Sequence, residues 1–567
     1  MRGYILKTVL TAVIMAVSAF AMWPSVNGGF VSDDPNYVAG NPQIRDLSPL
    51  GIKNIFTRPH LGLYKPVTML SLAVNYRFSG LDPRPYHITN VTLHALNAAL
   101  VFAFILLLTQ NGAAAFLCAL LFGVHPLHVE SVAWIAERKD MLYALFFLLS
   151  SILYAAYAKT GRRAELAGSI LCFALSLAAK PAGITLPAAL FIYDYLLRRG
   201  FSRQLLLEKI PYLLVAGAFG AWNYFLLDST QQVRTAFNLA DRILFVFYGL
   251  KFYIVKLLWP ANLSAVYPFP VKNGNSLPPE YWLGPVTVIL CALLLFKYFR
   301  KTRPVMAGLA FYCVTLLPVL QFVNVGTVIT ADKYSYIPAL GLFMPLSVYA
   351  IKGLTTLRHK NIRLAGAAAV CAAALLGTLI TAARARCRVW ENDYTLFSDA
   401  AAKYPDTSTL NYFAAALRDS GQPDRAREVF EMAIKLSLPM QNTASNANDV
   451  FLSYTSLAGL LRDQGRNDEA EKMLSALRRL KPDFAPMLFL LADVQARKGR
   501  LKTALELFDQ ASRSASLEAP SCALSGDIYM RLGDYARAKE HYDRAHRLDP
   551  QYPPAENRMP GIKTAAD

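Results

Sequence analysis

The chain has 567 residues, of which 54% are hydrophobic and only 17% are charged, and its mean hydropathy is +0.30. This composition is too apolar for an ordinary soluble protein of this length. The net charge of +19 would suggest nucleic-acid binding in a soluble protein, but basic loops in a membrane protein set its topology and attract anionic head groups. Composition therefore predicts an integral membrane protein that contacts lipid and has no nucleic-acid partner.

Apolar runs of about 15 to 22 residues are long enough to cross, or nearly cross, a bilayer as helices. The first run follows Arg2 and Lys7, and no small-residue cleavage site precedes Met22 and Trp23, so we interpret it as a retained span rather than a signal peptide. Eleven predicted spans cover residues 4–23, 89–109, 113–131, 141–158, 164–179, 183–197, 209–227, 282–298, 305–323, 335–351 and 363–383.

The basic loops predict the topology. With Arg2 and Lys7 inside, the basic segments 159–163, 198–203, 297–303 and 352–363 all lie on the cytoplasmic side. A twelfth apolar stretch, 243–259, contains Lys251 and Lys256. If it crossed the membrane, the last two basic loops would lie on the outer side. We therefore expect it to be a non-crossing or re-entrant helix. The C-terminal part is then periplasmic in a bacterium or lumenal in a eukaryote, and the short loops favour a bacterial inner membrane.

Charged residues become frequent after residue 383, which predicts a membrane domain over 1–383 and a second domain over 384–567. Within the second domain Gly465, Gly499 and Gly533 are spaced by 34 residues, and Gly421 precedes them by 44. Each glycine is followed five residues later by alanine. A 34-residue helix–turn–helix period is the tetratricopeptide repeat (TPR), whose stacked helices form a solenoid with a peptide-binding groove. The clearest repeats cover 410–550.

The long segment 24–88 lies outside in this topology and begins with two adjacent carboxylates, Asp33 and Asp34. Adjacent carboxylates at a membrane surface are costly unless they are solvated or paired. The alternative is a simple acidic turn formed by the Asp-Pro-Asn sequence. From this segment alone, both interpretations stay open.

The outer end of the second span carries His87, Asn90 and His94, which share one helical face. The next outer loop contains His125, His128 and Glu130 in a His-x-x-His-x-Glu pattern. Imidazole and carboxylate are zinc ligands, but the order differs from His-Glu-x-x-His and Pro126 interrupts the helix, so a catalytic zinc site is disfavoured. A role in binding phosphate or sugar hydroxyls is the other interpretation.

Two further outer segments hold polar groups at helix breaks. Lys180 precedes Pro181 between two spans, and Asp332 and Lys333 follow the polar pair Gln321 and Asn324. Backbone groups freed at helix breaks can bind an anion together with a cation. These outer ends can act together only if they line one site.

The polar motifs together resemble those of the transmembrane and tetratricopeptide-repeat (TMTC-type) O-mannosyltransferases and their bacterial relatives, within the GT-C class of polytopic glycosyltransferases. The resemblance covers nearly the whole chain. It rests on Asp33-Asp34, 64–68, 86–94, His125-Pro126-x-His128-x-Glu130, Glu137-Arg138-Lys139-Asp140, 180–184, 331–338 and the C-terminal repeats. It implies an all-α fold with a polytopic helical bundle of about eleven spans followed by a TPR solenoid.

The resemblance also implies transfer of a sugar, with mannose as one candidate, from a polyprenyl-phosphate donor to a hydroxyl of a protein or glycan, with inversion. One of Asp33 and Asp34 would be the base, with Asp33 slightly favoured. The implied donor-phosphate ligands are the cations Lys65, Arg138, Lys180 and Lys333. The implied site-lining residues are His87, His94, His128, Glu130 and Asp332. No cofactor is specified, a divalent metal is left open, and the acceptor would bind in the TPR groove.

Two rival hypotheses differ in what the membrane domain does. A non-catalytic scaffold would use the TPR domain to assemble periplasmic or lumenal proteins and would tolerate loss of both aspartates. A transporter or flippase for a lipid-linked sugar would need polar residues through the membrane midplane. The polar motifs gather at the outer ends of the spans, which counts against transport.

Overall fold

The computed structural model describes residues 2–226, 237–272, 274, 276–300, 302–322, 326, 328–437, 444–549 and 552–559. Residues 227 and 323 at two predicted span ends, the polar residue Asn324 and part of the insert 441–449 lie outside these ranges. The chain forms two compact units, one of Met1–Ala39 and Gln43–Asp399 and one of Gly40–Pro42 and Ala400–Asp567. The predicted boundary after residue 383 falls inside the continuous helix α17 (Ile362–Val389).

The first unit is helical throughout its described residues, with only isolated bridges and no strand among them. Besides α17, its α-helices are α1 (Arg2–Met22), α2 (Asp34–Tyr37), α3 (Pro49–Thr57), α4 (Pro66–Ser79), α5 (Pro83–Thr109), α6 (Gly112–Val124), α7 (Val129–Ala133), α8 (Arg138–Thr160), α9 (Arg163–Ala179), α10 (Leu186–Leu196), α11 (Arg203–Leu207), α12 (Ile210–Leu226), α13 (Leu239–Leu258), α14 (Pro279–Phe299), α15 (Arg303–Leu316) and α16 (Leu340–Lys360). Its 3-10 turns are η1 (Trp23–Asn27), η2 (Pro42–Ile44), η3 (Pro126–His128), η4 (Ile135–Glu137), η5 (Pro181–Thr185), η6 (Leu317–Val319) and η7 (Asp332–Ser335).

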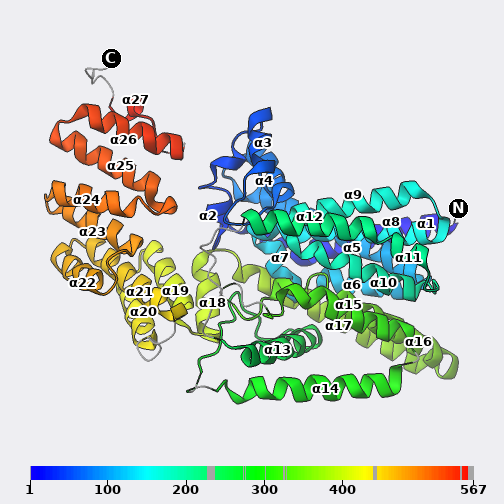
Figure 1. Cartoon of the computed structure of the whole chain (residues 1–567). Helices are drawn as coiled ribbons and strands as arrows, with labels where there is room; N and C mark the ends of the chain where they lie inside the picture. The colour runs from blue at the N-terminus through cyan, green and yellow to red at the C-terminus, as the bar shows by residue number, and fades with distance from the viewer. Residues whose placement is uncertain are drawn as a thin grey trace. The chain divides into compact units, whose positions relative to one another are not determined.

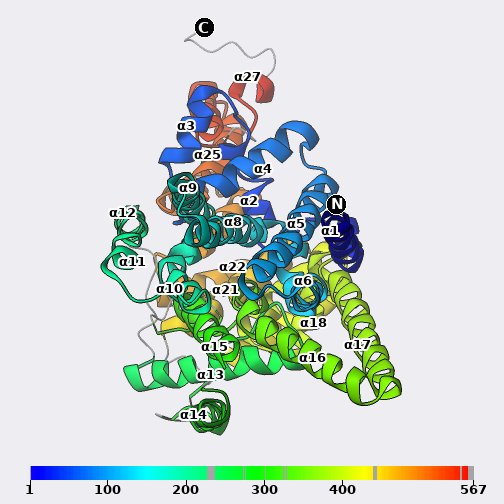
Figure 2. The same cartoon turned by 90° about the vertical axis from the view of Figure 1, so that its right-hand side faces the viewer.

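Local sequence explains where the helices that carry the site begin and end. Asp82 caps α5 by accepting a hydrogen bond from the Arg84 amide, and prolines occupy its first turn, where no intrahelical donor is needed. Helix α8 ends at Gly161, whose left-handed backbone (φ +74°) suits glycine. Helices α1, α5, α6, α16 and α17 pack side by side, as Figures 1 and 2 show.

Seven helical segments of the described chain are long and apolar enough to cross a membrane, so the protein is a multi-pass membrane protein. They are Ile5–Asn27, Pro83–Thr109, Ile135–Thr160, Arg203–Phe225, Pro279–Tyr298, Leu340–Lys360 and Ile362–Val389. Helix α6 and the segment Pro126–Ala133, bent by 51°, add an eighth if they form one span.

Judged by length and composition, the described helices therefore provide seven or eight candidate spans and not the predicted eleven. The predicted spans 164–179, 183–197 and 305–323 form α9, α10 and α15, which have 17, 11 and 14 residues. At about 1.5 Å per residue these helices are shorter than the hydrocarbon core of about 30 Å. The stretch 243–259 forms α13, which is not among the candidate spans.

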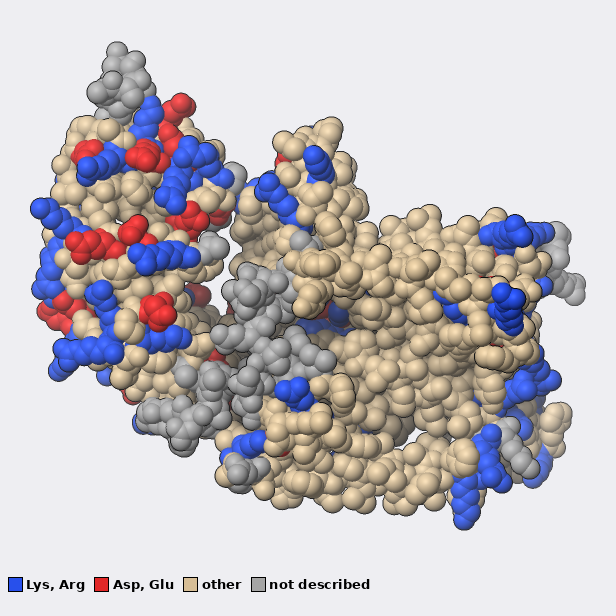
Figure 3. All heavy atoms as spheres, viewed as in Figure 1, with Lys and Arg blue, Asp and Glu red and all other residues tan. Residues whose placement is uncertain are grey.

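Many basic side chains of the first unit gather at one end of an apolar body (Figure 3). Figure 3 shows a broad surface without charged residues along this unit and Lys and Arg gathered at the right-hand end of the view. Such a distribution is typical of a membrane domain whose short loops on one side are basic.

The second unit is a series of helices that begins within α18 (Asp393–Lys403). Its other helices are α19 (Thr407–Asp419), α20 (Pro423–Ser437), α21 (Ala444–Asp463), α22 (Asn467–Leu480), α23 (Ala485–Arg497), α24 (Leu501–Ala511), α25 (Ala515–Leu532), α26 (Tyr535–Leu548) and α27 (Ala555–Arg558) (Figure 1). The four repeated glycines all have a left-handed backbone, with φ between +74° and +80°, and connect the two helices of each repeat. The alanines five residues later are fully buried, which lets the paired helices approach closely. The predicted all-α fold with a TPR solenoid is confirmed.

Candidate active site around Asp33

The two adjacent aspartates lie in different environments. Asp34 begins α2 and is completely buried, and its carboxylate accepts hydrogen bonds from the amides of Val31 (3.0 Å) and Ala136 (2.6 Å). Burial raises the pKa of Asp34 to about 8, although these two amides oppose the shift. Asp33 precedes it at the N-cap of α2 and is exposed. Asp34 therefore fixes the loop to the turn before α8, while the Asp33 carboxylate stays accessible.

Three lysines from distant parts of the chain surround Glu137. The Nζ atoms of Lys139 and Lys333 lie 2.9 and 3.0 Å from Glu137 Oε1, and Lys180 Nζ lies 3.9 Å from Oε2. Each of these lysine side chains is 14 or 15% exposed, whereas Glu137 is 2% exposed. The acid is thus buried among lysines whose side chains remain partly accessible.

Two further acids, Asp140 and Glu130, form ion pairs with these lysines. Asp140 forms an ion pair with Lys180. Glu130 Oε1 lies 3.3 Å from Lys333 Nζ, and its Oε2 accepts a hydrogen bond from the Lys333 amide at 3.0 Å. Burial opposes the charge of Lys333, but Glu137 and Glu130 outweigh it and raise its pKa well above the usual range. Lys333 is therefore a permanent cation at neutral pH.

Lys65 joins this group through a tyrosine. Its side chain is buried, its Nζ donates to Tyr37 Oη, and the same Nζ lies 4.2 Å from the centre of the Tyr37 ring. Lys139 Nζ also reaches Tyr37 Oη at 3.5 Å. Burial and the neighbouring Lys139 lower the pKa of Lys65, while Glu137 and Asp33 act in the opposite direction, so Asp33 lies within electrostatic range of this ammonium group.

We call Lys65, Lys139, Lys180 and Lys333 with Glu130, Glu137 and Asp140 the lysine cluster. It sets four cationic side chains against three acidic ones. Charged side chains removed from water are costly unless they are compensated, and the partly exposed Lys139, Lys180 and Lys333 can be reached by an added anion. The cluster can therefore receive a phosphate beside the exposed carboxylate of Asp33.

Asp332 lies next to Lys333 in η7 but faces another partner. Its Oδ1 accepts a hydrogen bond from Tyr267 Oη at 2.8 Å, and its side chain is 1% exposed. Burial, helped by the nearby Glu130, raises the pKa of Asp332 to about 7. This residue fixes η7, which presents Lys333, by its bond to Tyr267 and not through a lysine of the cluster.

The three predicted site-lining histidines are buried among helices rather than joined to the lysine cluster. His94 uses both ring nitrogens, Nδ1 with Tyr336 Oη at 2.8 Å and Nε2 with Gly123 O at 3.0 Å. His128 Nδ1 bonds to Phe122 O at 2.8 Å. His87 Nε2 lies 3.3 Å from the carbonyl of Gly29, near the start of the Asp33 loop. All three side chains are inaccessible, so we correct their predicted contact with substrate to a role in packing.

Arg138, predicted as a phosphate ligand, instead connects α4 and α5. Its Nε donates to Asn90 Oδ1 at 2.9 Å and its Nη2 donates to Tyr86 O at 2.9 Å. Its Nη1 donates to Ser71 O at 3.2 Å and to Asn75. The guanidinium group is fully buried, and every nitrogen already binds protein, so we exclude it from the phosphate site.

Sequence reasoning assigned no role to Lys139, Tyr37 or Trp134, which the structure places in or against the lysine cluster. Lys139 is within a motif that was noticed, but adjacent residues of a helix point in different directions. Tertiary packing decides which way each side chain of this segment points, so that Lys139 faces Glu137 and Arg138 faces α5. Among the described residues, no group of three or more His, Cys, Asp or Glu side chains is placed to hold a metal ion.

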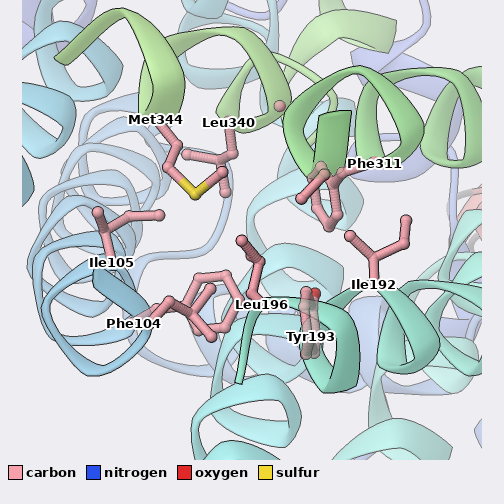
Figure 4. A pocket seen from close by; sticks show the side chains of 11 residues that line it. Phe104, Ile105, Ile192, Tyr193, Leu196, Phe311, Leu340 and Met344 are labelled. Carbon is pink, nitrogen blue, oxygen red and sulfur yellow. The ribbon is translucent and has the colours of Figure 1, made fainter. Parts of the chain in front are cut away.

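A separate apolar gap lies between four membrane helices (Figure 4). It has a volume of about 20 Å³, enough for roughly one water molecule. Its lining includes Phe104 and Ile105 of α5, Ile192, Tyr193 and Leu196 of α10, Phe311 of α15, and Leu340 and Met344 of α16. The gap is too small for a sugar and has no charged side chain in its lining.

Tetratricopeptide-repeat family models match residues 456–518 and 519–552. The protein O-mannosyl-transferase TMTC3 of Mus musculus is 24% identical over 610 aligned residues, which cover 94% of this chain and 63% of the relative. The O-mannosyl-transferase F38B6.6 of Caenorhabditis elegans is 26% identical over 75% of this chain and 62% of its own length. Human TMTC2 is 38% identical over 136 residues, which cover 23% of this chain and 16% of that protein.

Two solved structures also align with the chain. ArnT of Cupriavidus metallidurans, bound to undecaprenyl phosphate, covers 83% of this chain at 16% identity with a TM-score of 0.37. An oligosaccharyltransferase of Archaeoglobus fulgidus, tethered to an acceptor peptide, covers 74% at 12% identity with the same TM-score. These scores do not establish a shared fold.

The sequence relatives match both the membrane unit and the repeats. The chain spans about 63% of the length of the first relative, so the activity of that whole protein does not transfer automatically. The expected resemblance is nevertheless confirmed. The chain is similar, over nearly its whole length, to the transmembrane and tetratricopeptide-repeat protein O-mannosyl-transferases.

Proposed function

We propose that the protein is a membrane glycosyltransferase that moves a sugar from a polyprenyl-phosphate donor to a hydroxyl group of a protein or glycan. The observation that carries this proposal is the exposed carboxylate of Asp33 at the start of α2, whose last residue, Tyr37, contacts Lys65 and Lys139 of the lysine cluster. Sugar transfer from a lipid phosphate needs these two features together. A base must take the acceptor's proton, and cations must stabilise the departing phosphate.

In the proposed reaction Asp33 accepts the proton of the acceptor hydroxyl as its oxygen attacks the reacting carbon of the sugar. The bond between that carbon and the phosphate oxygen breaks, and the electron pair leaves with the polyprenyl phosphate. One displacement of this kind inverts the configuration at the sugar carbon. Lys139, Lys180 and Lys333 stabilise the charge that grows on the phosphate, because their ammonium groups are already held in place by Glu137, Glu130 and Asp140.

Asp34 has a positioning role in this proposal. Both of its carboxylate oxygens accept backbone hydrogen bonds, and its side chain has no exposed surface on which to meet an acceptor. It holds the loop so that its neighbour faces outward. This difference between the two aspartates supports Asp33 as the base.

We assign the TPR unit to acceptor binding. An apolar cavity of about 470 Å³ lies in this unit, lined by Val450, Phe451 and Tyr454 of α21 and by Met473, Ala476, Leu477 and Leu480 of α22. A large apolar side chain of an extended acceptor peptide would fit it, with the groove supplying the remaining contacts. Tyr454→Ala should then raise the KM for a protein acceptor and leave the KM for a short soluble acceptor unchanged.

The names of the relatives make mannose the first sugar to test. For location we propose a cytoplasmic N-terminus, with Asp33 and the TPR unit outside, in a bacterial inner membrane or, in a eukaryote, facing the lumen. A cysteine introduced at the exposed Arg427 tests this placement. Labelling of that cysteine only from the cytoplasmic side would overturn it.

The activity itself is tested with purified protein, labelled polyprenyl-phosphate sugars and candidate peptides. Asp33→Asn should lower the transfer rate by about 10²- to 10⁴-fold, because an amide cannot accept the proton. Asp46→Asn is the matched control, since Asp46 is an exposed carboxylate of the same segment that bonds to Ser48 instead. Equal transfer by wild type and Asp33→Asn would refute the base assignment, and absence of transfer with every donor would refute the proposed function.

A non-catalytic scaffold remains the second candidate, and the cavity in the TPR unit is the observation that favours it. The scaffold hypothesis and the enzyme hypothesis predict different results for Asp33→Asn. A scaffold would lose its partner after Tyr454→Ala and would keep full function after Asp33→Asn.

A further inference from the structure

The loop that presents Asp33 contains a strained residue. Ser32 has a left-handed backbone, with φ +55°, although it carries a side chain. Residues with a Cβ atom avoid this region because of steric crowding, and they adopt it only where surrounding contacts hold them. The contact that holds Ser32 is distant in sequence, because its amide donates to Asp393 Oδ1 at 2.8 Å. Asp393 is therefore bonded directly to the residue before the proposed base.

The same turn makes a second contact with the loop. Glu391 O accepts a hydrogen bond from the Gly29 amide at 2.9 Å. A Cβ atom added at Gly28 would lie 3.3 Å from the carbonyl oxygen of Trp390, so the two backbones already approach closely. Residues 390–393, between α17 and α18, thus contact the Asp33 loop at both its start and its strained residue.

Trp390 extends this contact to the lysine cluster. Its ring is 1% exposed and stacks on Trp134, with 5.5 Å between the ring centres and 29° between the planes. Lys333 Nζ lies 4.2 Å from the centre of the Trp134 ring. A cation over an indole face is attracted by the ring, so the position of Trp134 influences where the ammonium group rests. Trp390 packs against the same ring and so helps to hold it in place.

We propose that Trp390 and Asp393 are positioning residues that align the two halves of the proposed reaction. Asp393 holds the backbone that presents the Asp33 carboxylate, and Trp390 holds the aromatic surface on which Lys333 rests. This inference rests on the proposed function, because it assigns the two residues to that site. Neither residue touches the reacting atoms.

The two residues should affect different kinetic constants. Asp393→Ala removes the acceptor for the Ser32 amide, so we expect kcat to fall about tenfold while the KM for the polyprenyl-phosphate sugar stays unchanged. Asp393→Asn keeps a side-chain oxygen that can accept this bond and should retain most of kcat. Trp390→Ala should instead raise the KM for the donor several-fold, with Trp390→Phe close to wild type.

A rescue separates positioning from general support of the fold. Glycine adopts φ +55° without a steric penalty, so the double variant Ser32→Gly with Asp393→Ala should recover part of the lost kcat. Asp399→Ala is the matched control, because Asp399 is on the same helix α18 and pairs with Arg386 at 2.6 Å. It should leave both constants unchanged in folded protein. Equal losses in Asp393→Ala and Asp399→Ala, or no rescue by Ser32→Gly, would overturn the inference.

Amide hydrogen exchange provides a test that needs no activity. The Ser32 amide should be protected in wild type and in Asp399→Ala, and should exchange at least tenfold faster in Asp393→Ala. If Asp33→Asn abolishes transfer but Asp393→Ala changes neither kcat nor exchange, the positioning inference is wrong and the proposed function stands. If wild type transfers no sugar, the proposed function is wrong, and unchanged exchange in Asp393→Ala would show that the loop contact is wrong as well.

Discussion

The first unit contains two clusters of charged side chains. They differ in how completely the positive and negative charges within each cluster are paired. In the second charged cluster, formed by Asp194, Arg199, Glu208 and Lys209, two cations face two acids. Arg199 Nη1 lies 2.9 Å from Asp194 Oδ1 and 2.8 Å from Glu208 Oε2, and Lys209 Nζ lies 2.7 Å from Asp194 Oδ2. Tyr154 and Tyr157 donate to the same carboxylates.

The lysine cluster lacks this balance. It has one more cation than acids, and Glu137 Oε2 has Lys180 only at 3.9 Å. The exposed Asp33 stands within electrostatic range of Lys65, and it forms no ion pair with any of the described residues. A closed set of ion pairs holds helices together, whereas an incomplete set beside an accessible carboxylate can bind a charged substrate. The comparison favours a structural role for the second charged cluster and supports the proposed role of the lysine cluster in binding phosphate.

Among the residues of the two charged clusters, the largest effect should follow from neutralising Lys333. Lys333→Gln removes one cation that faces the departing phosphate, and we expect the transfer rate to fall by about 10²- to 10³-fold. Lys333→Arg keeps the charge and should retain more activity. Steady-state transfer per folded molecule is the measurement, and a rate within twofold of wild type in Lys333→Gln would contradict the assignment.

Lys209→Met in the second charged cluster should give the opposite pattern. Removing Lys209 leaves the buried carboxylate of Asp194 with Arg199 as its remaining cation, and breaking one buried ion pair destabilises a protein by roughly 3–5 kcal/mol. We expect a lower melting temperature in detergent and unchanged transfer per folded molecule. Asp194→Leu combined with Lys209→Met should recover part of the stability, because no unpaired charge remains at that pair. Reduced transfer in fully folded Lys209→Met would show that this cluster takes part in function.

Arg138→Lys tests the exclusion of Arg138 from the phosphate site. A lysine has one ammonium group and cannot reach all the acceptors on α4 and α5 that the guanidinium group binds. Leaving buried acceptors unpaired should lower stability by about 1–3 kcal/mol. Donor affinity should not change. A weaker donor affinity at unchanged melting temperature would return Arg138 to the phosphate site.

A further prediction is a pH dependence of stability from Asp34. Burial raises its pKa from 3.8 to about 8, so between these values the folded protein holds a proton that the unfolded chain has released. The stabilising contribution of Asp34 is therefore complete below about pH 4 and is lost as the pH rises to about 8. The melting temperature of wild type minus that of Asp34→Asn should decrease from pH 5 to pH 8. The same difference measured for Asp46→Asn should stay flat, and an increase for Asp34→Asn would contradict the sign.

The repeats could be predicted from short sequence patterns because each turn and helix pair is specified by residues that are close together in the chain. Glycine at each turn and alanine five residues later specify both the left-handed turn and the close helix pair. Apolar length likewise predicted that the first unit spans a membrane. It could not distinguish full spans from α9, α10 and α15, because an apolar run does not reveal where packing or a break will end its helix.

The polar site was predicted only in part. Asp33, Lys180 and Lys333 were selected as outer polar residues, and the structure gives each a place at or near the lysine cluster. His94 and His128 were selected for the same reason but are buried among aromatic side chains. A polar residue at the end of a span can face either substrate or the helix core, and only tertiary packing decides between them. The contact between Asp393 and Ser32 joins residues 361 positions apart, which no local pattern can anticipate.

The central claim is that the lysine cluster, and not the second charged cluster, binds the donor's phosphate. It is tested most directly by measuring the Kd of a sugar-free polyprenyl phosphate for wild type, Lys333→Gln and Lys209→Met in the same detergent. We expect Lys333→Gln to weaken binding by at least about tenfold, since it removes a charge-assisted contact, and Lys209→Met to bind within twofold of wild type. Equal affinity of wild type and Lys333→Gln, or a weaker affinity only in Lys209→Met, would contradict the account.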